Sequence, residues 1–130
     1  MRIAQKNILN KDLSDKIIGA ALNVYNILGR GFLEKVYENA LCLELKRSNI
    51  PYECQKQIKV LYREQMVGDY ISDIVVDNKI ILEVKATLET PGYHEAQILN
   101  YLKATGFNLG YLLNFGSKDK LYFKRFVFSV

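Results

Sequence analysis

The spacing of apolar residues changes period near Tyr52, and this change is the feature that most constrains the fold. Before it, apolar residues recur at positions 13, 17, 20, 21, 24, 25 and 28, which is the spacing of one helical face. From Tyr52 onward, apolar and polar residues alternate with a period of two, as they do in half-buried strands. A chain that carries both periods in separate blocks is predicted to combine helices with a β-sheet.

Two helices are predicted ahead of the change. The first spans Leu13 to Leu28 and ends at "LGRG", because Gly29 and Gly31 tolerate the backbone angles that terminate helices. The second spans about 33–48 and is closed by "SNIP". Its apolar stripe is predicted to consist of Leu33, Val36, Tyr37, Ala40 and Leu41.

The remaining elements follow from alternation and turn residues. Strands are predicted at 52–62, 66–76 and 79–86, joined by turns at 63–65 and at Asp77 and Asn78. A third helix follows, with Pro91 in its first turn and Gly106 as its cap, and two further strands at 109–115 and 121–130 complete the sheet. The expected order is therefore α-α-β-β-β-α-β-β, an α+β fold.

Composition limits the class of protein. The 130 residues suffice for one domain, 1–130, and 49% hydrophobic with 25% charged residues predicts a chain that folds on its own. No apolar stretch approaches the ~20 residues of a membrane helix, and the N-terminus lacks the apolar core of a signal peptide, so we expect a cytoplasmic protein without a membrane partner. The net charge of +4 fits a polyanionic partner. Cys42 and Cys54 are too few for a disulfide framework and are expected to be free, packed thiols.

Charged residues interrupt the third predicted strand, "KIILEVKA". Glu83 and Lys85 lie two residues apart and therefore on one face. Asp73 occupies a similar position in the preceding strand, ten residues earlier. Two carboxylates beside a lysine suit a hard divalent cation and a phosphate group. The alternative is an exposed edge strand on which Asp73 simply pairs with Lys85, and spacing alone leaves the two interpretations equally open.

Other polar residues fall close to the predicted apolar faces. Glu34 borders the buried arc of the second helix, with Glu38 one turn further along; the alternative role for Glu34 is to interact favourably with the helix dipole. In the third helix Gln97 and Tyr101 share a face with His94, although these residues alone are better explained with Tyr101 in the core and Gln97 at its rim.

Several classes of enzyme lose support. His94 is the only histidine, and the chain has no Gly-x-Ser-x-Gly, which argues against a Ser-His-Asp mechanism. It also has neither a Gly-x-x-x-x-Gly-Lys phosphate loop nor a Gly-x-Gly-x-x-Gly after a strand. Nucleotide hydrolysis and dinucleotide redox chemistry are therefore disfavoured.

The motifs together resemble a known family. "GFLEKVYENAL" resembles the signature of the GxxExxY protein family through Gly31, Glu34 and Tyr37. "SDIVVDNKIILEVKA" resembles the core of the PD-(D/E)XK nuclease superfamily, with Ser72 where the superfamily name has proline. "HEAQILNYLKATG" is similar to the Gln-x-x-x-Tyr motif of RecB-type nucleases.

The resemblance implies a restriction-endonuclease-like fold, a mixed sheet flanked by helices. Carried over by position, it implies that Asp73 and Glu83 hold a metal ion, that Glu34 is an additional acidic ligand, and that Lys85 is the catalytic lysine. Gln97 and Tyr101 are implied to support the site or the substrate strand.

The expected function is Mg²⁺- or Mn²⁺-dependent phosphodiester hydrolysis, with DNA as the preferred nucleic-acid partner over RNA. A homodimer is expected because a domain of this size has little surface with which to hold a duplex. The alternative is a non-catalytic nucleic-acid- or protein-binding module on the same fold. The basic residues that would follow a nucleic-acid backbone, or equally serve as solubilising charges, are Lys103, Lys118, Lys120, Lys124 and Arg125.

Strand parity makes one geometric prediction. A two-residue turn at Asp77 and Asn78 would put Asp73 and Glu83 on opposite faces, so a shared metal requires an odd-length loop. We expect the loop to be 76–78, with Asn78 in the left-handed region that asparagine tolerates. Asp73 would then face Ile81, with Glu83 as its diagonal neighbour and Glu34 approaching from the second helix.

Overall fold

The computed structural model describes residues 10–129 and has the predicted order of elements. Helices α2 (Lys11–Leu28) and α3 (Glu34–Arg47) precede a hairpin of β1 (Tyr52–Tyr62) and β2 (Gln65–Val76). Strand β3 (Ile80–Lys85), helix α4 (Gly92–Thr105), β4 (Leu109–Asn114) and β5 (Tyr122–Val127) follow. Residues 1–9, on which the absence of a signal peptide was argued, lie outside the described residues, as does Val130 at the end of the last predicted strand.

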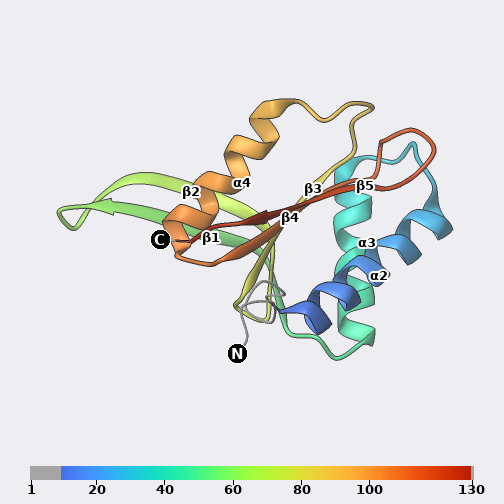
Figure 1. The fold of residues 1–130 in the computed structure, drawn as a ribbon, viewed down its shortest axis with the longest axis horizontal. Coiled ribbons are helices and arrows are strands. Elements are labelled where there is room, and N and C mark those ends of the chain that lie inside the picture. Colours follow the sequence, from blue (N-terminus) through green and yellow to red (C-terminus); the bar gives the residue numbers. More distant parts are fainter. Residues whose placement is uncertain (1–9, 130) are drawn as a thin grey trace.

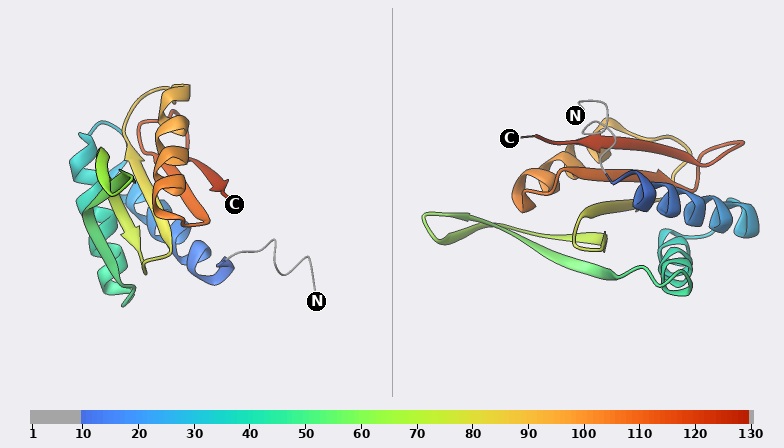
Figure 2. Two further views of the ribbon diagram at one scale, coloured as in Figure 1. Left: turned by 90° about the vertical axis from the view of Figure 1, so that its left-hand side faces the viewer. Right: turned by 60° about the horizontal axis from the view of Figure 1, so that its bottom comes forward.

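The five strands form one mixed sheet in chain order, β1-β2-β3-β4-β5. All neighbouring pairs are antiparallel except β3 and β4, which are parallel and are joined by α4. Helices α2 and α3 cover one face and α4 covers the other, while the β1–β2 hairpin extends beyond the rest of the sheet (Figures 1 and 2). This mixed sheet flanked by helices confirms the predicted fold class.

Two cores lie on either side of the sheet. Even-numbered residues of β3, such as Ile80 and Leu82, pack against α2 and α3, whereas Ile81 packs against Ile98 and Leu102 of α4. Strand β3 is therefore buried on both faces and lies in the middle of the sheet, not at its edge. The edge-strand explanation of Glu83 is thus wrong.

Helix α3 buries a different stripe from the one predicted. Leu33 precedes the helix and is 82% exposed, and Val36 is also exposed, while Tyr37, Glu38 and Leu41 are buried. The rotation of α3 is fixed by Tyr37, whose hydroxyl donates to the carbonyl of Gly29 at 2.6 Å and whose ring stacks on Phe115. These tertiary contacts place Glu38 on the sheet side of the helix.

Among the residues that the structure describes, no helix is both long and apolar enough to cross a membrane.

Candidate active site

The site forms where β2 and β3 separate. The ladder between them runs from Val76–Ile80 to Ile74–Leu82, and the same register would set Asp73 opposite Glu83. At this point the two carboxylates accept hydrogen bonds that backbone carbonyls accept elsewhere in the ladder. Glu83 Oε2 accepts from the N–H of Asp73 at 3.1 Å, and Asp73 Oδ2 accepts from the N–H of Val84 at 2.8 Å. The carboxylates thus satisfy N–H groups that no strand partner satisfies.

The loop between β2 and β3 has the predicted odd length but different residues. It comprises 77–79, with Asp77 and Asn78 both left-handed (φ 51° and 52°), and the N–H of Lys79 donates to the carbonyl of Val76 at 2.9 Å. The prediction that Asp73 faces Ile81 is therefore wrong by two residues. Both loops have an odd number of residues, so Asp73 and Glu83 still lie on the same face and their side chains still meet.

At Asp73 the side chains of the hairpin change the face of the sheet to which they point. On one side of it, Ile74 packs toward α3 and Val75 toward α4; on the other, Ser72 reaches Glu83 and Tyr70 packs on Tyr101 of α4. Even-numbered residues thus change face at Asp73. The cause lies opposite it in β1, where Gln55 adopts a left-handed conformation (φ 54°).

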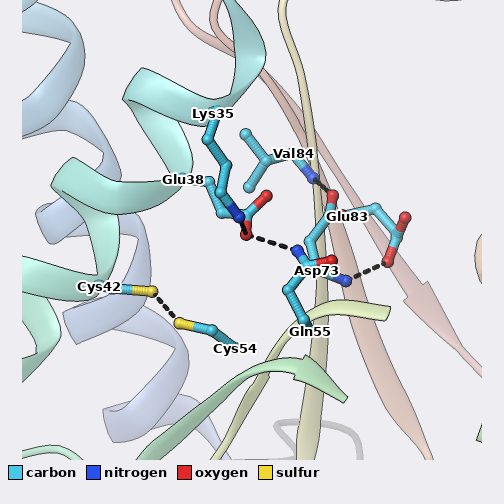
Figure 3. A network of polar contacts seen from close by, with 8 residues as sticks. All are labelled: Lys35, Glu38, Cys42, Cys54, Gln55, Asp73, Glu83 and Val84. Atoms are coloured by element: carbon cyan, nitrogen blue, oxygen red, sulfur yellow. Dashed lines mark hydrogen bonds and ion pairs between the residues drawn. The ribbon is translucent and has the colours of Figure 1, made fainter. Parts of the chain in front are cut away.

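This reversal brings α3 to the site. Gln55 Nε2 donates to Glu38 Oε1 at 2.6 Å, and Lys35 Nζ lies 3.1 Å from the same oxygen. Figure 3 shows Asp73 between the Glu38–Gln55 contact and the Glu83 carboxylate. Sequence analysis placed Glu38 at the edge of its helical arc and assigned it no role; only the contact with Gln55 reveals it.

Burial and the charges of neighbouring acids raise the pKa of both carboxyl groups. Burial raises the pKa of Glu83, which is 2% exposed, to about 8, and the charge of Asp73 adds to this effect. Burial also raises the pKa of Asp73 to about 6, against the hydrogen bond from Val84; Glu38 and Glu34 raise this pKa further. Lys85 lowers the pKa of both groups and so opposes these shifts.

The predicted residues of α4 line the same side of the sheet. Tyr101 donates its hydroxyl to the carbonyl of Ile71 at 3.3 Å. Burial and the charge of Glu83 raise the pKa of Tyr101 to about 12, and Gln97 partly offsets this rise. His94, which is buried, has no hydrogen-bond partner for either ring nitrogen among the described residues, and its pKa is lowered by burial and by Lys85. The structure therefore places Tyr101 against β2, two residues from Asp73, and gives no hydrogen bond from Lys85 or Gln97 to either carboxylate within 10–129.

The donor atoms suit a hard cation with two protein ligands. Hydrogen bonds occupy Oδ2 of Asp73 and Oε2 of Glu83, while Oδ1 and Oε1 accept none from residues 10–129. Mg²⁺ commonly takes one or two carboxylates and keeps several waters. Within 10–129, no group of three or more His, Cys, Asp or Glu side chains is arranged to hold a metal ion, so the structure does not bring Glu34 into a three-residue ligand set.

Asp73 and Glu83 thus form an acidic pair, half-buried and buried respectively, where two strands of a mixed sheet separate. The family model described as "PD-(D/E)XK nuclease superfamily" matches residues 11–126. The chain belongs to this superfamily. The crystal structure of SSO0001 shares the fold, with a TM-score of 0.57 and 18% identity over 75% of this chain. The match covers 51% of that chain, so this protein spans about half of its length. No curated protein is significantly similar in sequence.

Proposed function

We propose that this protein is a metal-dependent nuclease that hydrolyses phosphodiester bonds, with DNA as its preferred substrate. The observation that carries the proposal is the Asp73–Glu83 pair, because two carboxyl groups with raised pKa values, one buried and one half-buried, are costly for a fold and are typical of functional sites. Superfamily membership over 11–126 supports it independently.

Each residue of the site is assigned a role that follows from its chemistry. Asp73 and Glu83 would hold Mg²⁺ or Mn²⁺, with Glu34 contributing only negative charge near Asp73. When bound, the cation supplies an acidified water and offsets negative charge on the phosphate. Lys85 donates hydrogen bonds to a non-bridging phosphate oxygen, and Gln97 and Tyr101 position the substrate strand. On the α3 side, the negative charge of Glu38 raises the pKa of Asp73.

The finer family assignments are part of the proposal. Gly31 has a left-handed φ of 114°, and Tyr37 accepts from the N–H of Phe32 at 3.1 Å, so this motif holds the turn that starts α3 at Glu34. Such a role supports membership of the GxxExxY family. The shared face of Gln97 and Tyr101 supports the RecB-type motif in the same way.

A cleavage assay tests the proposal. Single- and double-stranded DNA and RNA are incubated with the protein in Mg²⁺, Mn²⁺ or EDTA, and Asp73→Asn and Glu83→Gln are compared with Asp12→Asn, an exposed acid of α2. Cleavage that requires the metal and is lost only in the first two variants supports the function. Binding without cleavage in any metal would favour the non-catalytic module, and undiminished cleavage by Asp73→Asn would exclude this site.

A further inference from the structure

A groove runs beside α4, away from the acidic pair. It lies between the β1–β2 hairpin and the C-terminal half of α4, with a volume of about 470 Å³, and its lining residues are Lys59, Val60, Leu61, Asn100, Lys103 and Ala104. No acidic residue lines it. Neither Lys59 nor Lys103 forms an ion pair with any residue in 10–129. The groove therefore presents unpaired positive charge.

An aromatic pair connects this groove to the site. Tyr70 is 40% exposed and packs against Tyr101 with ring centroids 5.8 Å apart. Tyr70 is opposite Ile58 in the hairpin, two residues along β1 from Val60 of the groove. Along α4, Gln97 and Lys103 are six residues apart, about 9 Å at 1.5 Å per residue. Along the hairpin from Asp73, Tyr70 therefore comes before the groove.

We propose that this groove binds a single strand of nucleic acid leading into the Asp73–Glu83 site. Lys59 and Lys103 would contact phosphates, and Tyr70 would stack on a base. The inference rests on the proposed nuclease function. Unpaired bases offer a free face to an aromatic ring, which bases inside a duplex do not.

Binding measured in EDTA separates this inference from catalysis. Fluorescence anisotropy compares one labelled oligonucleotide as single-stranded DNA, as single-stranded RNA and as a DNA duplex. We expect single strands to bind more tightly than the duplex, and the DNA and RNA arms show which polymer is preferred. The Lys59→Ala/Lys103→Ala variant should bind about tenfold more weakly, with a salt dependence reduced by a slope of about 1.4. The matched control, Lys16→Ala/Lys46→Ala, removes the same charge from α2 and α3.

Tyr70 has its own pair of variants. Tyr70→Leu should weaken single-strand binding about fivefold or more, while Tyr70→Phe keeps the stacking face and the affinity. Any of three results would overturn the proposal that the groove binds a single strand. These results are equal effects of the two lysine variants, duplex binding as tight as single-strand binding, and no binding at all. If the wild type cleaves yet binds independently of the groove, only this inference fails. If the groove binds single strands and no metal supports cleavage, only the proposed function fails.

A second observation concerns the two cysteines. Cys42 Sγ in α3 and Cys54 Sγ in β1 lie 2.6 Å apart, although both are free thiols (Figure 3). Cys42 is buried, as expected, but Cys54 is exposed, which corrects the prediction that both are packed. Cys54 precedes Gln55, whose side chain holds Glu38 beside Asp73. The pair therefore links α3 to β1 next to the site.

We infer that Cys42 and Cys54 form a reversible disulfide when the protein meets a hydroperoxide. The Cys54 thiolate attacks the peroxide, the oxygen–oxygen bond breaks, and a sulfenic acid forms as an alcohol or water leaves. The Cys42 sulfur then attacks the Cys54 sulfur, the sulfur–sulfur bond forms, and the hydroxyl leaves with the Cys42 proton as water. Two electrons pass from the two thiols to the peroxide. Little side-chain movement is needed to reach a bond of roughly 2.05 Å.

Peptide mass spectrometry after treatment with hydrogen peroxide tests this site. We expect an intramolecular cross-link between the peptides that contain Cys42 and Cys54, removed by dithiothreitol and absent from Cys42→Ser. In Cys42→Ser, Cys54 should instead accumulate sulfenic acid, which dimedone traps. Sulfinic acid at Cys54 with Cys42 still free in the wild type, or cross-links only between molecules, would overturn the inference.

Discussion

The carboxylate of Glu83 accepts a hydrogen bond from the backbone N–H of Asp73 at 3.1 Å, so each acid of the pair is held by the strand that carries the other. The pair is thereby fixed by the sheet itself and not by a flexible loop. Because Glu83 is buried and Asp73 half-buried, the protein without a metal must either keep them protonated or tolerate poorly screened charge.

The first prediction follows from the sign of these shifts. The folded pKa of Glu83, about 8, and that of Asp73, about 6, both exceed the ordinary values of 4.5 and 3.8, so the folded state binds more protons than the unfolded state. Their stabilising contribution is complete below about pH 4 and is lost as the pH rises through 6 and 8. We expect the free energy of unfolding in EDTA to fall by a few kcal/mol between about pH 5 and pH 8.5.

Urea denaturation at several pH values measures this effect. Glu83→Gln is the matched variant, because its side chain stays neutral at every pH, and it should lose most of the decline. An identical pH dependence in the wild type and Glu83→Gln would contradict the raised pKa of Glu83.

The second prediction concerns metal and pH together. Since carboxylates bind a cation only when deprotonated, Mn²⁺ should raise the melting temperature more at about pH 8 than at about pH 6. Differential scanning fluorimetry with and without Mn²⁺ measures the shift, and Asp73→Asn should abolish it. A shift that is the same at both pH values, or that persists in Asp73→Asn, would place the metal elsewhere.

Parity and motif spacing predicted much of this site, but tertiary geometry decided the rest. The sequence predicted that Asp73 and Glu83 share a face, because an odd loop preserves parity whichever three residues form it. It misplaced the loop because Asp77 and Asn78 both tolerate the left-handed region, so local preference does not select one register. Glu38 was missed because its approach depends on the left-handed Gln55, a residue type with no special preference for that conformation.

The third prediction separates Lys85 from the metal ligands. Lys85→Gln should reduce metal-dependent cleavage by about 10²–10³-fold, because it removes a positive charge that acts on the phosphate, while Mn²⁺ still binds. The comparison is made near pH 8.5, since loss of Lys85 raises the pKa of both carboxyl groups further. Lys79→Gln, in the exposed β2–β3 loop, is the control. Loss of Mn²⁺ binding in Lys85→Gln would show that the lysine serves the metal site instead.

The fourth prediction concerns Asn114, which lies beside Lys85 in the β3–β4 pair and is fully buried. Its Oδ1 accepts from the N–H groups of Thr87 and Gly116, both at 3.0 Å, and its Nδ2 donates to the hydroxyls of Thr87 at 3.3 Å and Thr90 at 2.9 Å. This one side chain therefore ties down the segment between β3 and α4, which connects Lys85 to Gln97.

Asn114→Ala should lower the free energy of unfolding by roughly 2–4 kcal/mol, because it leaves two partly buried backbone N–H groups without their acceptor. Urea denaturation near pH 6 provides the measurement. Asn100→Ala, at an exposed position of α4, should stay within about 0.5 kcal/mol of the wild type. A loss below about 1 kcal/mol in Asn114→Ala would mean that water replaces the amide and that the segment before α4 does not depend on Asn114.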